Sequence, residues 1–144
     1  MDAIIIAFEP FIDADTRRYI SEGVDLFNVA ATGLPEYAPV NVVLRGVHGD
    51  VRGGLLGFVW GGWLQVTALW VPAASRGEGY GARLLAAAEA QAIRHGATGV
   101  ALETYSFQAR AFYEKQGYTV RGEIADYPQG HSKYFLAKPL LTSG

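Results

Sequence analysis

The chain has 144 residues, 50% of them hydrophobic, with a mean hydropathy of +0.11 and a formal net charge of −2. This length is typical of one domain, and the composition is that of a packed globule, not of a disordered chain. The absence of cysteine excludes disulfides, thiolate zinc sites and a cysteine nucleophile, and three histidines scattered in the sequence argue against a metal site. The small negative charge gives no general attraction to nucleic acid or to an anionic membrane.

The first part of the chain predicts one strand and one helix. Ile4–Phe8 is a continuous apolar run, expected of a strand covered on both faces. It is too short for a signal or membrane segment and no basic residue precedes it, so a cytoplasmic protein is expected. Residues 13–31 then show helical spacing, with Asp13 or Asp15 available as a cap and a stop at Gly33-Leu34-Pro35.

The middle of the chain predicts an antiparallel meander. Strands are expected over 40–44, 51–60 and 63–71 because these stretches are rich in strand-forming residues. Turns at Gly46–Asp50 and at Gly61-Gly62 separate them. No helix is expected between these strands.

The remaining chain alternates helices and strands. A helix is predicted over 79–95, ended by Gly96, and a shorter helix over 107–115. Strands are predicted over 100–104, 118–124 and 133–137. The resulting order, β α β β β α β α β β, indicates one α/β domain over residues 1–144 with a mixed sheet.

A glycine-rich turn is the most informative segment. Arg76-Gly77-Glu78-Gly79-Tyr80-Gly81 joins a predicted strand to a predicted helix. The amides at a helix start are unpaired and attract anions, and glycine lets a phosphate approach them closely. The lysine of a nucleoside-triphosphate loop is missing, and the glycine spacing differs from the dinucleotide fingerprint. A purely structural turn is the alternative.

This turn matches the Arg/Gln-x-x-Gly-x-Gly/Ala pattern of the GNAT N-acetyltransferases. The segment Ala109–Tyr118 closely resembles their second motif, Ala-x-x-x-Tyr-Glu-Lys-x-Gly-Phe/Tyr, and Leu69-Trp70-Val71-Pro72 resembles the strand before the turn. The resemblance runs from Val40 to Leu140, and the preceding residues fit by element order only. It implies a small bacterial enzyme with acetyl-coenzyme A as co-substrate and no metal. The implied fold is a mixed, mostly antiparallel sheet with helices on both faces.

The resemblance also implies where the coenzyme lies. The amides from Arg76 to Ala82 would hold its diphosphate, and the main chain of Leu69 and Val71 would run beside its pantetheine arm. The family's bulge in that strand is not visible in the sequence. The predicted coenzyme-binding residues are Leu69, Trp70, Val71, Arg76, Gly77, Glu78, Gly79, Tyr80, Gly81, Ala82, Ser106 and Lys115. Arg83 is a further candidate for phosphate contact, and for Arg83 and Lys115 a solvated helix face is the alternative.

Tyr113 is the predicted general acid. In GNAT enzymes the tyrosine at this motif position lies near the coenzyme sulfur. A phenol with a pKa of about 10 stays protonated at neutral pH and donates to a departing thiolate. The alternative role of Tyr113 is packing beside Phe112.

The general base departs from the family pattern. Many GNAT enzymes carry an acidic residue two positions before Leu69, where this chain has Thr67, and threonine is no base. Glu103 on the next predicted strand is the expected substitute, acting directly or through water, with a surface carboxylate as the alternative. Glu36 and Tyr37 are further candidates for the acceptor side. Ser106, where many relatives have Asn, is expected to cap the following helix, to contact the coenzyme, or both.

The acceptor itself is left open by the sequence. Seven residues are expected near the slot, where they would stack on a substrate, enclose a cationic amine or serve as core: Trp60, Trp63, Trp70, Tyr105, Phe107, Tyr127 and His131. The predicted function is transfer of acetyl to a primary amine of a small molecule or a protein. The alternative is an acyl-coenzyme A-binding sensor or partner module without turnover, and a homodimer is possible under either prediction.

Overall fold

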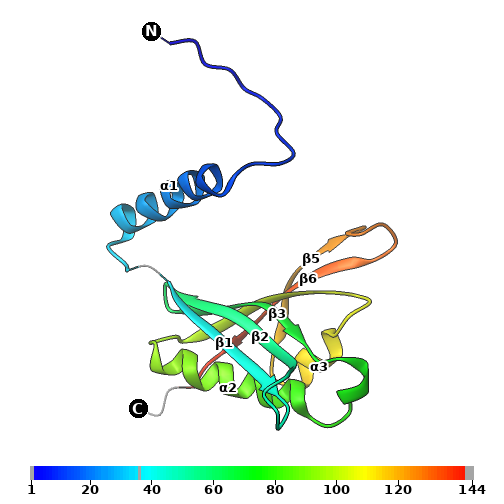
Figure 1. Ribbon diagram of the computed structural model, residues 1–144. Coiled ribbons are helices and arrows are strands. Elements are labelled where there is room, and N and C mark those ends of the chain that lie inside the picture. Colours follow the sequence, from blue (N-terminus) through cyan, green and yellow to red (C-terminus); the bar gives the residue numbers. More distant parts are fainter. Residues whose placement is uncertain (1, 36, 142–144) are drawn as a thin grey trace. The chain divides into compact units, whose positions relative to one another are not determined.

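The computed structural model describes residues 2–35 and 37–141, which form two units, Met1–Glu36 and Tyr37–Gly144. Figure 1 shows the helices and strands of both. No helix within the described residues combines the length and the apolar character that a membrane crossing requires.

The first unit contains the helix α1 (Ala14–Thr32). The Asp13 side chain caps its start by accepting from the Thr16 amide at 2.7 Å, and hydrogen bonding to the side chain and the amide of Thr16 lowers the pKa of Asp13. Gly33 ends α1 in the left-handed conformation, with φ of 69°. The predicted strand at Ile4–Phe8 is wrong, because these residues form no regular secondary structure. A strand needs a partner strand for its ladder, and the described part of this unit contains only one helix.

Residues 37–141, the described part of the second unit, form six strands and two α-helices. The strands are β1 (Ala38–Arg45), β2 (Val51–Trp60), β3 (Trp63–Trp70), β4 (Gly99–Tyr105), β5 (Thr119–Ala125) and β6 (Ser132–Pro139). The helices are α2 (Tyr80–Arg94), α3 (Arg110–Lys115) and a single 3-10 turn, η1 (Ala73–Ser75). The order from β1 to β6 is the predicted one. The helix α3 begins at Arg110, three residues later than predicted, because a turn precedes it.

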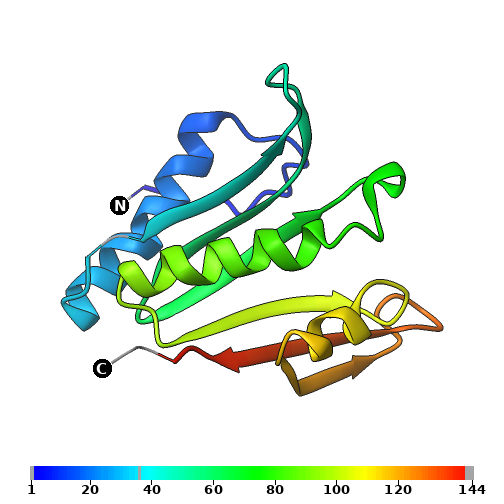
Figure 2. The same cartoon turned by 90° about the horizontal axis from the view of Figure 1, so that it is seen from below.

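The strands form one mixed sheet in the order β1-β2-β3-β4-β6-β5. All neighbouring pairs are antiparallel except β3 and β4, which are parallel. Figures 1 and 2 show α2 and α3 on the same face of this sheet. This mixed, mostly antiparallel α/β architecture confirms the predicted fold class. The predicted helices on both faces of the sheet are not confirmed, because the two α-helices of this unit lie on one face.

The core lies between this face and α2. Leu85 and Ala88 of α2 pack with Leu55, Leu64 and Val100 of the sheet, and all five are fully or almost fully buried. Burial of each large apolar side chain contributes about 1.5–3 kcal/mol, so this layer holds the sheet and α2 together.

A polar network crosses the same layer. The Tyr118 hydroxyl donates to the Glu89 carboxylate of α2 at 2.7 Å, and Lys138 of β6 donates to that carboxylate at 3.1 Å. Burial and the neighbouring Glu89 carboxylate raise the pKa of Tyr118 well above its usual value. The network therefore satisfies a carboxylate that would otherwise lie unpaired in a mostly apolar layer.

Candidate active site

The two central strands part to form a cleft. β3 and β4 pair only at Trp63–Gln65 and Gly99–Ala101, and beyond these residues the strands diverge (Figure 2). A bulge accompanies the divergence: Leu56 of β2 faces Ala68, Gly57 faces Val66, and Thr67 is the extra residue on β3. The cleft between the strands has a volume of about 1410 Å³. Every predicted site residue lines it except Glu78 and Ser106.

The glycine-rich turn lies at the α2 side of this cleft. The amides of residues 77–82 donate to no protein acceptor within the described residues. The Arg76 amide, in contrast, is already bonded to the Ala73 carbonyl at 3.3 Å, so the row of free amides begins one residue later than predicted. Six successive free N–H groups at the start of a helix make a site for an anionic group such as a diphosphate.

The three glycines of the turn have different physical roles. Gly77 and Gly79 have φ of +83° and +80°, a conformation that residues with a Cβ rarely adopt. Gly79 is also the N-cap residue of α2, without any side-chain cap. At Gly81 a Cβ atom would lie 3.3 Å from the Phe112 ring, so this glycine permits the close packing of α2 against α3.

The Arg76 side chain folds back onto the end of β3. Its Nε donates to the Val71 carbonyl at 2.8 Å, and its guanidinium lies 5.0 Å from the centre of the Trp70 ring. The Val71 carbonyl is therefore occupied in this structure, and the terminal nitrogens of Arg76 are left for an anion. Arg83 is exposed, lies over the Tyr80 ring and does not line the cleft. This agrees with the alternative prediction that Arg83 belongs to a solvated helix face.

Ser106 does not cap α3. The N-cap residue of α3 is Ala109, which has no side-chain cap, and the Ser106 hydroxyl instead accepts from the Ser132 amide at 3.0 Å. Gln108 takes over the local bonding of the turn, accepting from the Tyr105 amide at 3.0 Å. Sequence reasoning missed Gln108, because a glutamine in a turn has many potential partners.

Tyr113 is buried, with 7% of its surface exposed, and lines the cleft. Its ring stacks on Phe112 at 5.1 Å and meets the edge of Tyr118 at 5.8 Å. Burial raises the pKa of the Tyr113 hydroxyl, which therefore keeps its proton at neutral pH. A protonated phenol in a cleft is chemically suited to donate to a developing negative charge.

Glu103 lines the cleft from β4, with its side chain 47% exposed. It pairs with the Lys133 ammonium at 2.8 Å, and this bond raises the pKa of Lys133. Along β4, Leu102 and Thr104 are buried beneath the helices, so Glu103 belongs to the opposite face of the sheet. Sequence reasoning missed Lys133, whose position opposite Glu103 depends on the register of β4 with β6.

The other candidates for the acceptor side differ in position. The Thr67 hydroxyl donates to the Leu56 carbonyl at 3.1 Å, which ties the bulge to β2. Tyr37 packs on Phe58 at 5.2 Å and does not line the cleft. Glu36 lies outside the described residues.

Four of the predicted aromatic residues gather beside the cleft. Tyr105 stacks between Phe107 and Tyr127, with ring centres at 5.4 and 5.8 Å, and His131 meets Phe107 at 4.9 Å. Trp60 and Trp63 instead flank the β2–β3 turn and do not line the cleft, and Trp70 lies with Arg76.

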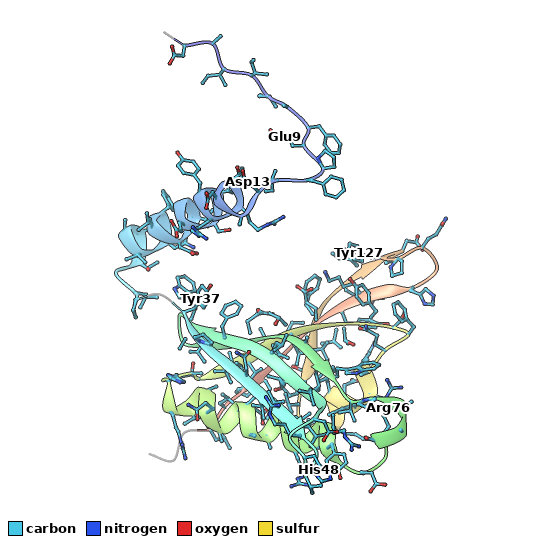
Figure 3. The ribbon with its side chains drawn as sticks, viewed as in Figure 1. Glu9, Asp13, Tyr37, His48, Arg76 and Tyr127 are labelled. Atoms are coloured by element: carbon cyan, nitrogen blue, oxygen red, sulfur yellow. The ribbon has the colours of Figure 1, made fainter. Side chains whose placement is uncertain are left out.

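The two ends of the site lie on different sides of the sheet. Figure 3 shows Arg76 near the start of α2, whereas Tyr127 lies near the β5–β6 hairpin. The parting of β3 and β4 connects them. The cleft is thus lined by a turn with free amides on the α2 side, by Glu103, Tyr105 and Phe107, and by the buried phenol of Tyr113. Among the described residues, no group of three or more His, Asp or Glu could hold a metal ion.

Comparison with known proteins identifies the family of this chain. Residues 11–118 match the model of the acetyltransferase (GNAT) family. The chain is 46% identical over 96 residues to blasticidin-S acetyltransferase of Streptomyces morookaense, covering 66% of this chain and 71% of that protein. It is 34% identical over 126 residues to acetyltransferase Atu2258 of Agrobacterium fabrum, covering 88% of this chain and 92% of that protein.

A solved structure extends the likeness to the fold. The crystal structure of an acetyltransferase from Bacillus cereus is 31% identical and superposes with a TM-score of 0.80, covering 93% of this chain and 98% of that one. The chain therefore belongs to the acetyltransferase (GNAT) family and is an N-acetyltransferase that depends on acetyl-coenzyme A.

Proposed function

We propose that this enzyme transfers acetyl to a primary amine of a small molecule or a protein, with Tyr113 as the acid and Glu103 as the proton acceptor. The observation that carries this proposal is the buried, protonated Tyr113 in a cleft whose α2 side carries six free amides. Acetyl-coenzyme A, when bound, supplies a thioester whose carbonyl carbon is open to attack by an amine.

The coenzyme would be held by main chain. The free amides of residues 77–82 bind its diphosphate, aided by the terminal nitrogens of Arg76 and by Lys115, which lines the cleft. The edge of β3 from Val66 to Trp70 has no partner on the β4 side among the strands that the structure describes, so it is available to an extended amide-bearing chain. The Cβ-free Gly77 and Gly79, with no protein atom near the position of a Cβ, leave room for the phosphates.

Proton transfer completes the reaction. As the new C–N bond forms and the C–S bond breaks, the Tyr113 hydroxyl would give its proton to the departing sulfur and regain one from the nitrogen of the forming amide. The ammonium proton of the acceptor passes through water to the Glu103 carboxylate, because an alkylammonium with a pKa of about 10.4 is mostly protonated at neutral pH. Lys133 holds Glu103 in position through their ion pair.

A thiol-release assay tests the proposal. The full chain is incubated with acetyl-coenzyme A and a panel of primary amines, and free thiol is measured against an amine-free control. We expect amine-dependent thiol release and an N-acetylated product by mass spectrometry. If calorimetry detects acetyl-coenzyme A binding but no amine releases thiol above the control, the proposed transfer is wrong and a non-catalytic binding module takes its place.

A further inference from the structure

Three nearly parallel rings form a stack that begins at the cleft, where Phe107 and Tyr105 line it, and continues to Tyr127 outside it. Phe107, Tyr105 and Tyr127 stack in that order, with interplanar angles of 8° and 12°. These residues come from the end of β4, the turn after it and the β5–β6 hairpin, so the stack fixes two separate segments against each other. We call these three residues the aromatic ladder. The separations of the ring centres, 5.4 and 5.8 Å, are within the range of favourable ring stacking.

The cation-binding capacity of the ladder is already used. The Lys133 ammonium lies 4.7 Å from the centre of the Tyr127 ring and 5.8 Å from that of Tyr105, and it also pairs with Glu103. Only 15% of its side chain is exposed. The protein's own lysine therefore occupies the place that a cationic substrate would take in an aromatic cage.

The charge beside the aromatic ladder is balanced. Glu103 is the sole carboxylate among the described residues that line the cleft, and Lys133 neutralises it. The neighbouring polar residues Gln65 and Thr67 are uncharged. A polycationic acceptor, such as a polyamine or a basic peptide, would find no excess negative charge here.

The ladder nevertheless presents free aromatic surface. Phe107 lines the cleft and is 55% exposed, although it stacks on Tyr105. Tyr113 lines the same cleft. We propose that the acceptor is an amine carried on a planar, conjugated ring, which stacks on Phe107 while the amine reaches the parting of β3 and β4. This inference rests on the proposed function, because it names the substrate class of the same site.

Stacking distinguishes a planar ring from a saturated ring of similar size. The test compares 2-phenylethylamine with 2-cyclohexylethylamine in thiol-release kinetics. We expect the phenyl compound to have the higher kcat/KM, by about 2- to 12-fold, the value of one aromatic pair. The difference is expected in KM more than in kcat, because the ring acts in binding.

Two variants assign the preference to the ladder. Phe107→Leu keeps an apolar side chain but removes the ring, and we expect it to bring the phenyl-to-cyclohexyl ratio close to one. Trp63→Leu removes a large exposed aromatic residue outside the cleft and serves as the matched control. We expect it to keep the phenyl-to-cyclohexyl ratio of the original protein. A phenyl preference that survives in Phe107→Leu overturns the inference.

The remaining outcomes separate the inference from the proposed function. If both ring amines are acetylated equally well, or if only ring-free amines are acetylated, the ladder does not select the acceptor and the proposed function stands. If no amine releases thiol, calorimetry with 2-phenylethanol and 2-cyclohexylethanol on the coenzyme-saturated protein decides. Equal Kd values then overturn the stacking role, and a phenyl preference lost in Phe107→Leu supports it.

Discussion

Gly79→Ala is expected to weaken acetyl-coenzyme A binding through the backbone alone. Gly79 has φ of +80°, and no protein atom lies within 4 Å of the position of an added Cβ. The left-handed conformation costs a residue with a Cβ about 1–2 kcal/mol. If the turn keeps its shape, the methyl group enters the space offered to the diphosphate. If the turn relaxes, the amides of residues 77–82 move.

Both routes reduce affinity; if the free turn relaxes and must regain the left-handed conformation to bind the coenzyme, the strain corresponds to about a 5- to 30-fold higher Kd. The matched control is Gly96→Ala at the other end of α2. Gly96 has φ of +83°, has no atom within 4 Å of an added Cβ, and does not line the cleft. Gly96→Ala should therefore carry the same strain without touching the coenzyme site.

Calorimetry gives Kd for acetyl-coenzyme A, and thermal unfolding gives Tm for each variant. We expect Gly96→Ala to lower Tm by about 4–8 °C, at about 4 °C per kcal/mol for this chain length, with an unchanged Kd. Gly79→Ala should raise Kd whether or not its Tm falls. An unchanged Kd in Gly79→Ala, or the same increase in both variants, would refute the role assigned to the turn.

Four further outcomes follow from the site and the core. Tyr113→Phe should lower kcat about ten-fold or more, at least about 1.4 kcal/mol, because the hydroxyl is the proposed acid; an unchanged kcat removes Tyr113 from the mechanism. Glu103→Gln should lower kcat about ten-fold or more, whereas Glu123→Gln on β5, outside the cleft, should retain the original kcat. Tyr118→Phe should lower the free energy of unfolding by about 1.5–3 kcal/mol through the lost bond to a charged carboxylate, measured by urea unfolding. The raised pKa of Tyr118 means that the folded protein keeps this proton when the unfolded chain loses it at about pH 10. Its stabilising contribution is therefore complete below that pH and declines above it, so Tyr118→Phe should flatten the alkaline loss of stability. Leu85→Ala should cost about 2–5 kcal/mol by leaving a cavity under the sheet, and a cost below 1 kcal/mol would contradict the described core.

Local patterns were sufficient to predict most elements of the fold. Runs of strand-forming residues and the glycines that end helices gave β1 to β6 and both helices of the second unit, with differences mainly at their ends. The strand at Ile4–Phe8 was predicted wrongly because an apolar run specifies burial, and a strand also requires a partner. The proposed homodimer and cytoplasmic location stay predictions.

The candidate site was predictable where main chain forms it and less so where distant side chains meet. The glycine turn and Tyr113 belong to continuous motifs. The Thr67 bulge, the Glu103–Lys133 pair and the Glu89–Lys138 network depend on strand register and on helix rotation. Each of these features joins residues that are far apart in the chain. Nothing in the local sequence specifies which of these residues will lie opposite one another.

The short contact between β3 and β4 has a consequence for finding the acceptor. Because β3 and β4 pair at only three residue pairs, the two halves of the sheet are joined at one end. A ligand that enters the open end supplies contacts that the protein itself lacks there. A ligand that binds only the folded state at a concentration of 100 times its Kd adds about 2.7 kcal/mol to stability. Libraries of amines can therefore be ranked by the rise in melting temperature of the coenzyme-loaded enzyme, before any of them has been shown to react.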